Sequence, residues 1–377
     1  MSKEPRRILH ITEMLSAAGI ESFIMNVYRN IDRTKVQFDF LVLRDEKEFY
    51  DDEIASLGGK KYFVHSNIRN TLLRVIDEAR QIERFLKNNH YDIVHIHYTT
   101  PLRSFYLKAA KNANVPVRIY HSHSAEVSGK SRIKIAIYNY CKKVIDKYAT
   151  HYFACSQAAA NWIYSKKTID SNQVKIIYNG IDTKKFTFDE AIRKSIRTEL
   201  GINDEFVIIN TGRFTEQKNQ SFIIDLVSVI LNNYEKNIKL LLLGDGPLKE
   251  TYLSKVNELN MNDHVVFLGV KNNVQDYLFA SDCYVMPSLY EGLPVAGIEA
   301  ECSGIHSVFS SEITKEVKIR DNVDFIDLSD SVKCWCEAVL KSSSGGREKA
   351  VEDVRKAGYD ISDVAYKMQE FYLGVVN

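Results

Sequence analysis

Two glutamates eight positions apart lie where an apolar, strand-like run gives way to a helix pattern. They are Glu291 and Glu299, in the stretch PSLYEGLPVAGIEA at 287–300. Gly292 allows the backbone to approach a ligand closely, and Pro294 suits the first position of a helix. The free N–H groups at such a helix start suit a phosphate, and carboxylates suit sugar hydroxyls. The pattern indicates a sugar-nucleotide site, although such a pair in isolation more often flanks an ordinary loop.

A second loop carries two cations between an expected strand and an expected helix. Arg213 and Lys218 lie in the stretch TGRFTEQKN at 211–219. A guanidinium and an ammonium that face one point suit a diphosphate, above all one that gains charge as it leaves. The turn Gly244-Asp-Gly246 after another apolar run is a weaker signal, because most such turns bind nothing.

The first loop of the chain offers a further anion-binding backbone. Gly19 ends this loop and opens a helix pattern, so backbone amides there can face a ligand. The loop is not a G-x-G-x-x-G fingerprint, which argues against a nicotinamide or flavin dinucleotide site.

Four histidines are grouped at the ends of two expected strands, namely His95, His97, His121 and His123. A metal cluster and a set of hydrogen-bonded side chains are both open at this point, but no Asp, Glu or Cys has ligand spacing nearby. The chain also lacks a D-x-D motif that could chelate a metal-bound diphosphate. We therefore expect neither a metal nor an organic cofactor.

The bulk composition describes a globular protein of two domains. The chain has 377 residues, of which 45% are hydrophobic and 26% charged. No apolar run approaches the ~18 residues of a membrane span, and the basic start lacks a signal h-region. The six cysteines show no metal-finger spacing and are interpreted as buried thiols. These features favour a cytoplasmic protein.

Charge is divided unevenly along the chain. Up to Phe186 there are 30 basic and 19 acidic residues, a net charge of +11, whereas the remainder carries 20 and 30, a net of −10. The basic half could face an anionic membrane or a phosphorylated acceptor, or the two halves could simply attract each other across a cleft. The basic residues are scattered and no recognised motif accompanies them, which argues against nucleic acid.

Strand and helix patterns alternate in both halves. Strands are expected at 7–11, 38–43, 91–97, 116–121 and 151–155, and again at 206–210, 239–244, 265–269, 283–286 and 306–309. Such alternation predicts an α/β fold with two doubly wound parallel sheets. We expect one domain over 1–186, a second over 187–359, and a helix over 360–377 that packs back on the first. Ligands of such sheets bind beyond the carboxyl ends of the strands, where these motifs fall.

Together the motifs resemble family 4 retaining glycosyltransferases of the GT-B fold, of the kind found in bacterial capsule and exopolysaccharide clusters. The resemblance covers nearly the whole chain, and the combination is specific where each piece is not. The matching elements, in the family's order, are Gly19-Ile-Glu21, Asp92–His97, His121-Ser-His123, Cys155-Ser156, Asn179–Asp182, Gly212-Arg213 with Lys218, Gly244–Gly246, Phe267–Gly269 and Glu291 with Glu299. It implies two Rossmann-like domains that face across a cleft, the first binding the acceptor and the second the nucleotide sugar.

The resemblance also implies how the second domain holds the donor. Arg213 and Lys218 would neutralise the diphosphate in place of a metal. Glu299 would hold the ribose. Glu291, together with the backbone amides of Gly292 and Leu293, would hold the sugar. Gly19 and Gly244 would add backbone contacts, and the loop after Gly269, around Lys271, would contact the base.

In the first domain, His123 is implied as the histidine at the reacting sugar. His97 and His121 are further candidates on the acceptor or sugar side. Retention in this family is thought to proceed on one face of the sugar, with the leaving phosphate accepting the acceptor's proton. Such chemistry depends on positioning and charge stabilisation more than on a protein nucleophile. The implied catalytic set is therefore His123, Glu291, Arg213 and Lys218.

The function so implied is a metal-independent hexosyl- or N-acetylhexosaminyltransferase. It would move a sugar from a nucleotide donor, UDP-linked, onto a lipid-linked or cell-surface glycan, with its basic domain on the cytoplasmic face of the membrane. Two alternatives are a GT-B enzyme that isomerises or hydrolyses sugar nucleotides and a catalytically silent partner of a true transferase. Two departures from the family stand out: Ala18-Gly19 replaces the usual Gly-Gly, and Ile305-His306 follows Gly304 where proline is usual.

Overall fold

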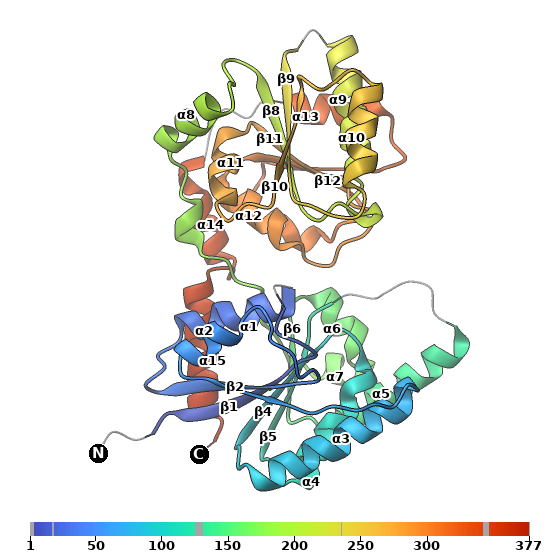
Figure 1. Cartoon of the computed structure of the whole chain (residues 1–377), viewed down its shortest axis with the longest axis vertical. Coiled ribbons are helices and arrows are strands. Elements are labelled where there is room, and N and C mark those ends of the chain that lie inside the picture. Colours follow the sequence, from blue (N-terminus) through green and yellow to red (C-terminus); the bar gives the residue numbers. More distant parts are fainter. Residues whose placement is uncertain (1–3, 17–18, 125–130, 235, 342–346, 377) are drawn as a thin grey trace. The chain divides into compact units, whose positions relative to one another are not determined.

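The computed structural model describes residues 4–16, 19–124, 131–234, 236–341 and 347–376. The chain divides into two compact units, one formed by 1–180 and 361–377 and the other by 181–360. Each unit is an α/β domain with a parallel sheet of its own, as predicted (Figure 1). The division falls six residues before the expected boundary, because Ile181 forms a parallel bridge with Asp360 at the other end of the second unit.

The sheet of the first unit has seven parallel strands in the order β3-β2-β1-β4-β5-β6-β7. Their bounds are β1 Arg6–Ile11, β2 Val36–Val42, β3 Lys60–Phe63, β4 Ile93–Tyr98, β5 Val117–Ser122, β6 His151–Ala154 and β7 Val174–Ile176. Strand order reverses between β1 and β4, and ligand sites of doubly wound sheets lie at such a switch point.

Helices cover both faces of this sheet and give the unit two apolar cores. One face is packed by α3 Thr71–Asn88, α4 Phe105–Asn112, α5 Arg132–Tyr148 and α6 Gln157–Ile163, and the other by α1 Gly19–Asn30, α2 Asp51–Ser56 and α15 Ile361–Gly374. The short helices η1 Pro101–Ser104 and α7 Lys166–Asp170 complete the unit. Burial on both faces explains why the central strands read as continuous apolar runs.

The C-terminal helix α15 packs on the first unit, as expected from the spacing of its apolar residues. It lies beside α1 and contributes Met368 and Tyr372 to the core on that face (Figure 1). The guanidinium of Arg6 on β1 donates to the carbonyls of Tyr372 and Leu373 at 2.7 and 2.8 Å. These bonds satisfy carbonyls at the helix C-terminus that have no partner within the helix.

The sheet of the second unit has six parallel strands in the order β10-β9-β8-β11-β12-β13. Their bounds are β8 Phe206–Thr211, β9 Ile238–Leu243, β10 Val265–Gly269, β11 Cys283–Met286, β12 His306–Ser310 and β13 Val323–Ile326. The helices are α8 Glu190–Glu199, α9 Gln220–Asn233, α10 Lys249–Glu258, α11 Val274–Ala280, α12 Val295–Ser303, α13 Val332–Leu340 and α14 Ala350–Lys356, with short turns η2 Thr183–Phe186, η3 Glu216–Lys218, η4 Lys315–Val317 and η5 Arg347–Lys349.

No helix among the described residues combines the length and the apolar character that crossing a bilayer requires. Five of the cysteines are buried and Cys334 is exposed, and all six are free thiols.

Candidate active site

In the second unit, glycines allow the loops after β8 and β9 to pack against each other. Gly212 and Gly244 have φ angles of +153° and +141°, which side chains disfavour. A Cβ on Gly244 would lie 1.9 Å from the carbonyl oxygen of Gly212. Backbone bonds join Gly212 N–H to the Leu243 carbonyl and Gly244 N–H to the Gly269 carbonyl, each at 2.9 Å. The strand-end loops therefore form one interlocked surface.

The loop after β8 is also joined to the loop after β11. The Leu289 N–H donates to the Gln217 carbonyl at 2.8 Å, and the Asn219 side-chain amide donates to the Pro287 carbonyl at 3.2 Å. Asn219 has a left-handed backbone with φ +53°, which asparagine tolerates, and it ends the turn before α9. These contacts bring the segments of Lys218 and Glu291 together.

The Lys218 ammonium lies 2.6 Å from Oε1 of Glu291, and their side chains are 21% and 11% exposed. The ion pair joins the two loops that the sequence analysis had treated as separate signals. Arg213 does not take part: its side chain is exposed and makes no ion pair with any residue that the structure describes. The structure thus places one cation on the glutamate and leaves the other available to an anion.

Glu299 lies on α12 and is half-buried, and burial raises the pKa of its carboxyl to about 7. Fully buried Tyr284 on β11 lies near both glutamates. Its pKa is raised by burial first, and the charges of Glu299 and Glu291 raise it further. The two carboxylates therefore lie around one buried tyrosine, which the sequence analysis missed because it read 283–286 only as an apolar strand.

No side chain caps the start of α12, so the first N–H groups of this helix donate to no capping oxygen from a side chain. Pro294 keeps an extended backbone, with φ −75° and ψ 115°, and precedes the first helical residue instead of occupying it as predicted. Gly292 and Leu293 come directly before this turn. The helix packs tightly, since a Cβ on Gly297 would lie 2.8 Å from the Val317 side chain.

Gly269 ends β10, and Lys271 follows this strand at the same edge of the sheet. Gly269 has a φ of +68° and open space around the position of a Cβ, so its backbone conformation alone accounts for a glycine there. The Lys271 ammonium lies 5.6 Å from the centre of the Tyr277 ring, a cation–π contact. This lysine is therefore held near the loop surface and is not fully extended into solvent.

The first unit contributes a layer of five histidines on the sheet face that α1 and α15 cover. They are His10 on β1, His95 and His97 on β4, and His121 and His123 at the end of β5. Burial lowers the pKa of His10 and His123 to about 3 and the pKa of the other three well below its usual value, so all five are neutral at pH 7. His10 was missed by the sequence analysis because it stands alone in its strand.

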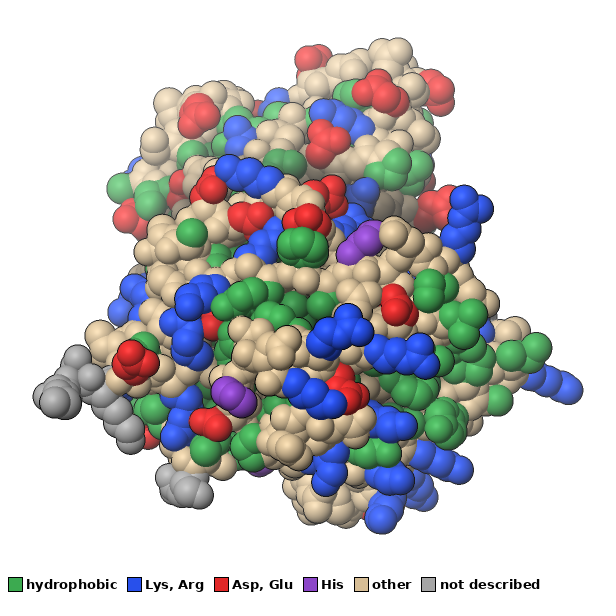
Figure 2. All heavy atoms as spheres, turned by 60° about the horizontal axis from the view of Figure 1, so that its bottom comes forward, with side chains coloured by type: hydrophobic (Ala, Val, Ile, Leu, Met, Phe, Trp, Pro, Cys, Tyr) green, Lys and Arg blue, Asp and Glu red, His purple; other side chains and the backbone are tan. Residues whose placement is uncertain are grey.

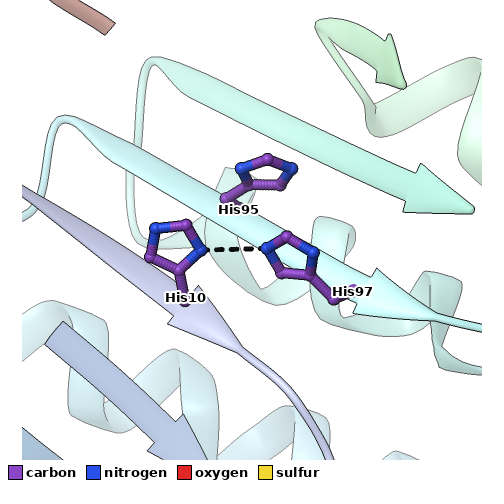
Figure 3. Close-up of side chains that lie close together, drawn as sticks. All are labelled: His10, His95 and His97. Carbon is purple, nitrogen blue, oxygen red and sulfur yellow. Dashed lines mark hydrogen bonds between the residues drawn. The ribbon is translucent and has the colours of Figure 1, made fainter. Parts of the chain in front are cut away.

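Only His123 of this group is more than slightly exposed. His97 and His121, the further candidates for the sugar side, are 1% and 0% exposed, and each bonds to other histidines. Two sets of described residues, His10 with His95 and His97, and His97 with His121 and His123, each hold three ring nitrogens within 4.8 Å of one another, close enough to share a metal ion. Figure 3 shows the first set. Most of those nitrogens already bond to each other or to a tyrosine, and no carboxylate joins either set.

The first loop places Gly19 at the start of α1, exposed, with nothing within 4 Å of a Cβ position. Ala18, where the sequence departs from the family, lies outside the described residues. Glu21 is 5% exposed and accepts a hydrogen bond from the Thr12 hydroxyl at 3.1 Å, and burial raises its pKa. The second departure, Ile305-His306, lies at the start of β12, whose first residue His306 is buried and bonds to the Ala338 carbonyl at 3.0 Å.

The chain matches known protein families and individual proteins over most of its length. The glycosyltransferase family 4 model matches residues 17–185, and the model of glycosyl transferases group 1 matches 192–326. A Bacillus subtilis protein named as a glycosyltransferase, EpsF, is 32% identical over 96% of this chain and 94% of its own length. The chain belongs to glycosyltransferase family 4.

Other relatives agree with this assignment. An Escherichia coli enzyme named UDP-Gal:alpha-D-GlcNAc-diphosphoundecaprenol alpha-1,3-galactosyltransferase is 25% identical over 98% of this chain and 97% of its own. A crystal structure of Anabaena HepE in complex with UDP superposes with a TM-score of 0.75 at 17% identity and covers 97% of this chain and 98% of that one. The fold of this family 4 glycosyltransferase is therefore GT-B, as the resemblance implied.

Proposed function

We propose that this glycosyltransferase moves a hexosyl or N-acetylhexosaminyl group from a UDP-sugar to a lipid-linked glycan, with retention at the anomeric carbon. The observation that carries the proposal is the ion pair of Lys218 and Glu291 on two joined strand-end loops, next to the start of α12, which has no side-chain cap. A cation, a carboxylate and an uncapped helix start in one place match a diphosphate attached to a sugar. The names of relatives support the donor and acceptor classes.

In this proposal the donor reorganises the ion pair. An arriving diphosphate competes with Glu291 for the Lys218 ammonium, and Arg213 supplies a second positive charge. Glu291 is thereby released to accept hydrogen bonds from the sugar hydroxyls, together with the amides of Gly292 and Leu293. Two cations beside the departing diphosphate stabilise the charge it gains when the bond to the anomeric carbon breaks.

The remaining steps need few protein groups. Glu299 accepts hydrogen bonds from the ribose, the loop of Gly269 and Lys271 contacts the base, and His123 contacts the transferred sugar. As the acceptor oxygen bonds to the anomeric carbon, its proton passes to the leaving phosphate oxygen, which balances the reaction without a protein base. No metal is required, because Arg213 and Lys218 supply the charge that a metal would provide.

We further propose that the first unit contacts an anionic membrane where the lipid-linked acceptor resides. Helix α5 begins with exposed apolar side chains among basic ones: Ile133 and Ile135 are 74% and 45% exposed beside Arg132 and Lys134. Figure 2 shows such blue and green side chains together at the right-hand edge of the first unit, where α5 projects in Figure 1. Apolar side chains interspersed with cations suit the headgroup region of an anionic bilayer.

The test is a thermal-shift screen against UDP-, GDP- and ADP-sugars, followed by transfer from the best ligand to polyprenyl-diphosphate-linked glycans. A ligand that binds only the folded chain raises its melting temperature. We expect a UDP-sugar to give the largest shift and a product extended by one sugar with the donor's anomeric configuration. Absence of any shift, or hydrolysis without a transferred sugar, would contradict the proposal.

A further inference from the structure

A basic groove lies on the surface of the first unit between the helices α5, α6 and α7 (Figure 1). It has a volume of about 630 Å³. Three lysines, Lys142, Lys143 and Lys166, and two asparagines, Asn139 and Asn161, line it, and none of its described lining residues is a carboxylate. Several ammonium groups and amide donors around one space are the chemistry that recognises a phosphate.

The charge of two of these lysines is not balanced within the protein. Neither Lys143 nor Lys166 forms a salt bridge with another residue that the structure describes. Asp146, the one acidic residue of α5, does not line the groove, and it accepts a hydrogen bond from the Thr168 hydroxyl at 2.6 Å. Two other cavities of the unit, of about 530 and 520 Å³, are lined by carboxylates together with cations. The basic groove therefore keeps an excess of positive charge that a ligand can neutralise.

The third lysine is held in place before any ligand binds. The Lys142 ammonium lies 5.4 Å from the centre of the Trp162 ring, a cation–π contact, and the lysine is half-buried. The ring N–H of Trp162 donates to the Thr99 carbonyl at 2.9 Å, and the Tyr138 ring packs edge-on against the indole at 5.7 Å. Because the indole is fixed on both sides, Lys142 loses little freedom when it meets an anion.

An exposed isoleucine lies on the same face of α5 as the lysines of the groove. Ile135 is 45% exposed, and Asn139, Lys142 and Lys143 follow it at four, seven and eight positions, a spacing that shares one helix face. At 1.5 Å per residue, Ile135 lies roughly 10–12 Å along the helix axis from these lysines. The headgroup layer of a bilayer is roughly 5–8 Å thick, so lysines at the phosphates place Ile135 at the hydrocarbon.

The groove lies away from the strand ends where the substrates of such sheets bind. Helix α5 runs back from the carboxyl end of β5 to the amino end of β6, and Lys142 and Lys143 lie in its second half. Helix α7 likewise precedes the amino end of β7. Substrates of doubly wound sheets bind beyond the carboxyl ends of the strands. A lipid in this groove is therefore an anchor for the enzyme and not the acceptor of the sugar.

We propose that the basic groove binds the phosphate of an anionic phospholipid, with its lysines on the phosphate and Ile135 among the acyl chains. The inference deepens the proposed membrane contact and rests on it for the direction of α5, whereas the groove is a feature of the first unit alone. A phospholipid accounts for both the cations and the apolar side chain, because a free phosphate would leave Ile135 in water.

Titration with a monomeric lipid tests the groove without a bilayer and without sugar transfer. The probe is dihexanoyl-phosphatidylglycerol below the concentration at which it forms micelles, added to the full chain labelled with ¹⁵N. We expect saturable shifts of the amide signals of α5, α6 and α7, and weaker binding of inorganic phosphate. Equal affinity for inorganic phosphate would show a site for free anions and overturn the proposal, as would the absence of saturable shifts in these helices.

Lys143→Gln combined with Lys166→Gln removes two exposed ammonium groups from the groove. We expect this double variant to bind phosphatidylglycerol vesicles about 30-fold more weakly, since each lysine at an anionic surface contributes about fivefold. Lys108→Gln combined with Lys111→Gln is the matched control, because it removes the same charge from exposed positions on α4 outside the groove. The control should stay within about threefold of the unaltered chain. Equal weakening in both would show a general effect of charge and overturn the proposal.

Failure of the groove and failure of the proposed function give different results. Full vesicle binding by the groove variant would overturn the groove, and loss of binding by Ile133→Ser with Ile135→Ser would still support the membrane contact. Transfer to a soluble short-chain acceptor should be unchanged in the groove variant, and a loss there would overturn the assignment as an anchor. Absence of transfer by the unaltered chain would overturn the proposed function, while the titration with monomeric lipid would still decide the groove.

Discussion

Lys218 on the loop after β8 and Glu291 on the loop after β11 form an ion pair of 2.6 Å between Nζ and Oε1. The pair closes two loops that are 72 residues apart in sequence and already joined by backbone bonds at Gln217 and Leu289. Neither side chain is fully buried, so a bound phosphate can replace the carboxylate on the ammonium at modest cost. If these loops bind the donor as proposed, they are joined before the donor arrives, with the charge of Lys218 paired to Glu291.

The two glutamates should differ in their effect on the reaction. Glu291→Gln should lower kcat by about 10²-fold, because it removes the carboxylate proposed to hold the sugar and leaves Lys218 without its ion-pair partner. Glu299→Gln should mainly raise the Kd for UDP, because that residue is proposed to hold the ribose. Steady-state kinetics and calorimetry on the two variants measure the difference. Equal losses of kcat in both would contradict the separation of roles.

Affinity for UDP should depend on pH through Glu299. Its pKa of about 7 means that the carboxylate is formed only as pH rises past neutrality, and the carboxylate is the better acceptor for ribose hydroxyls. We expect the Kd for UDP to fall between pH 6 and pH 8, and Glu299→Gln to remove most of this change. A Kd whose pH dependence is the same in the variant would locate the titrating group elsewhere.

The close approach of the strand-end loops should make Gly244 intolerant of a side chain. Gly244→Ala places a methyl group 1.9 Å from the Gly212 carbonyl and forces a φ of +141° on alanine. We expect a lower melting temperature, a destabilisation above ~1 kcal/mol, and loss of UDP binding. Gly374→Ala, with nothing within 4 Å of the new methyl group, is the control and should match the unaltered chain.

Much of this architecture could be predicted from the sequence, and the misses have physical causes. Most of the strands that were expected are central ones, whose two buried faces produce apolar runs, and the edge strand β10 is the exception among them. The strands that were not, β3, β7 and β13, are short and lie toward the sheet edges, and β3 begins with two lysines. Such strands have one partner and partial burial, so their composition resembles that of loops.

The site residues divide in a similar way: features that depend on local sequence could be predicted, and contacts between distant segments could not. The four site residues could be predicted from local sequence patterns. Arg213, Lys218 and Glu291 lie on loops that follow apolar strands, and Glu299 lies on the helix after the second of these loops. The contact between Lys218 and Glu291 could not be predicted, because it depends on backbone bonds between distant loops. His10 gave no signal by itself, since its meaning comes from strand register, which places it beside the histidines of β4.

The histidine layer should make the first unit sensitive to acid. Its five members have folded-state pKa values below the usual 6.5, so the unfolded chain binds more protons below that pH. Stability is therefore full above about pH 6.5 and falls as pH drops toward 3, by up to ~1.4 kcal/mol per pH unit for each histidine. Melting temperatures from pH 7.5 to 5 should fall steeply. His65→Gln, at an exposed histidine, should leave the slope unchanged, and a flat profile for the unaltered chain would contradict neutral burial.

Binding to anionic liposomes tests the membrane contact of the first unit. We expect the chain to sediment with vesicles of phosphatidylglycerol and to be released by salt, since charge attraction at a surface is screened within a Debye length. Ile133→Ser combined with Ile135→Ser should weaken binding, while Val270→Ser, at an equally exposed apolar residue of the second unit, should not. Binding that is unaffected by salt and by the α5 substitutions would contradict the proposal that this surface of α5 contacts the membrane.

The central claim is that Arg213 and Lys218 hold the donor diphosphate without a metal. The direct measurement is titration calorimetry of UDP and of the preferred UDP-sugar in EDTA, for the unaltered chain and for Arg213→Ala and Lys218→Ala, with Lys236→Ala as a control away from the loops. We expect binding and turnover to persist in EDTA, and each site variant to lose on the order of 10²-fold in turnover. Loss of activity in EDTA that Mn²⁺ restores, or undiminished turnover in both site variants, would contradict the account.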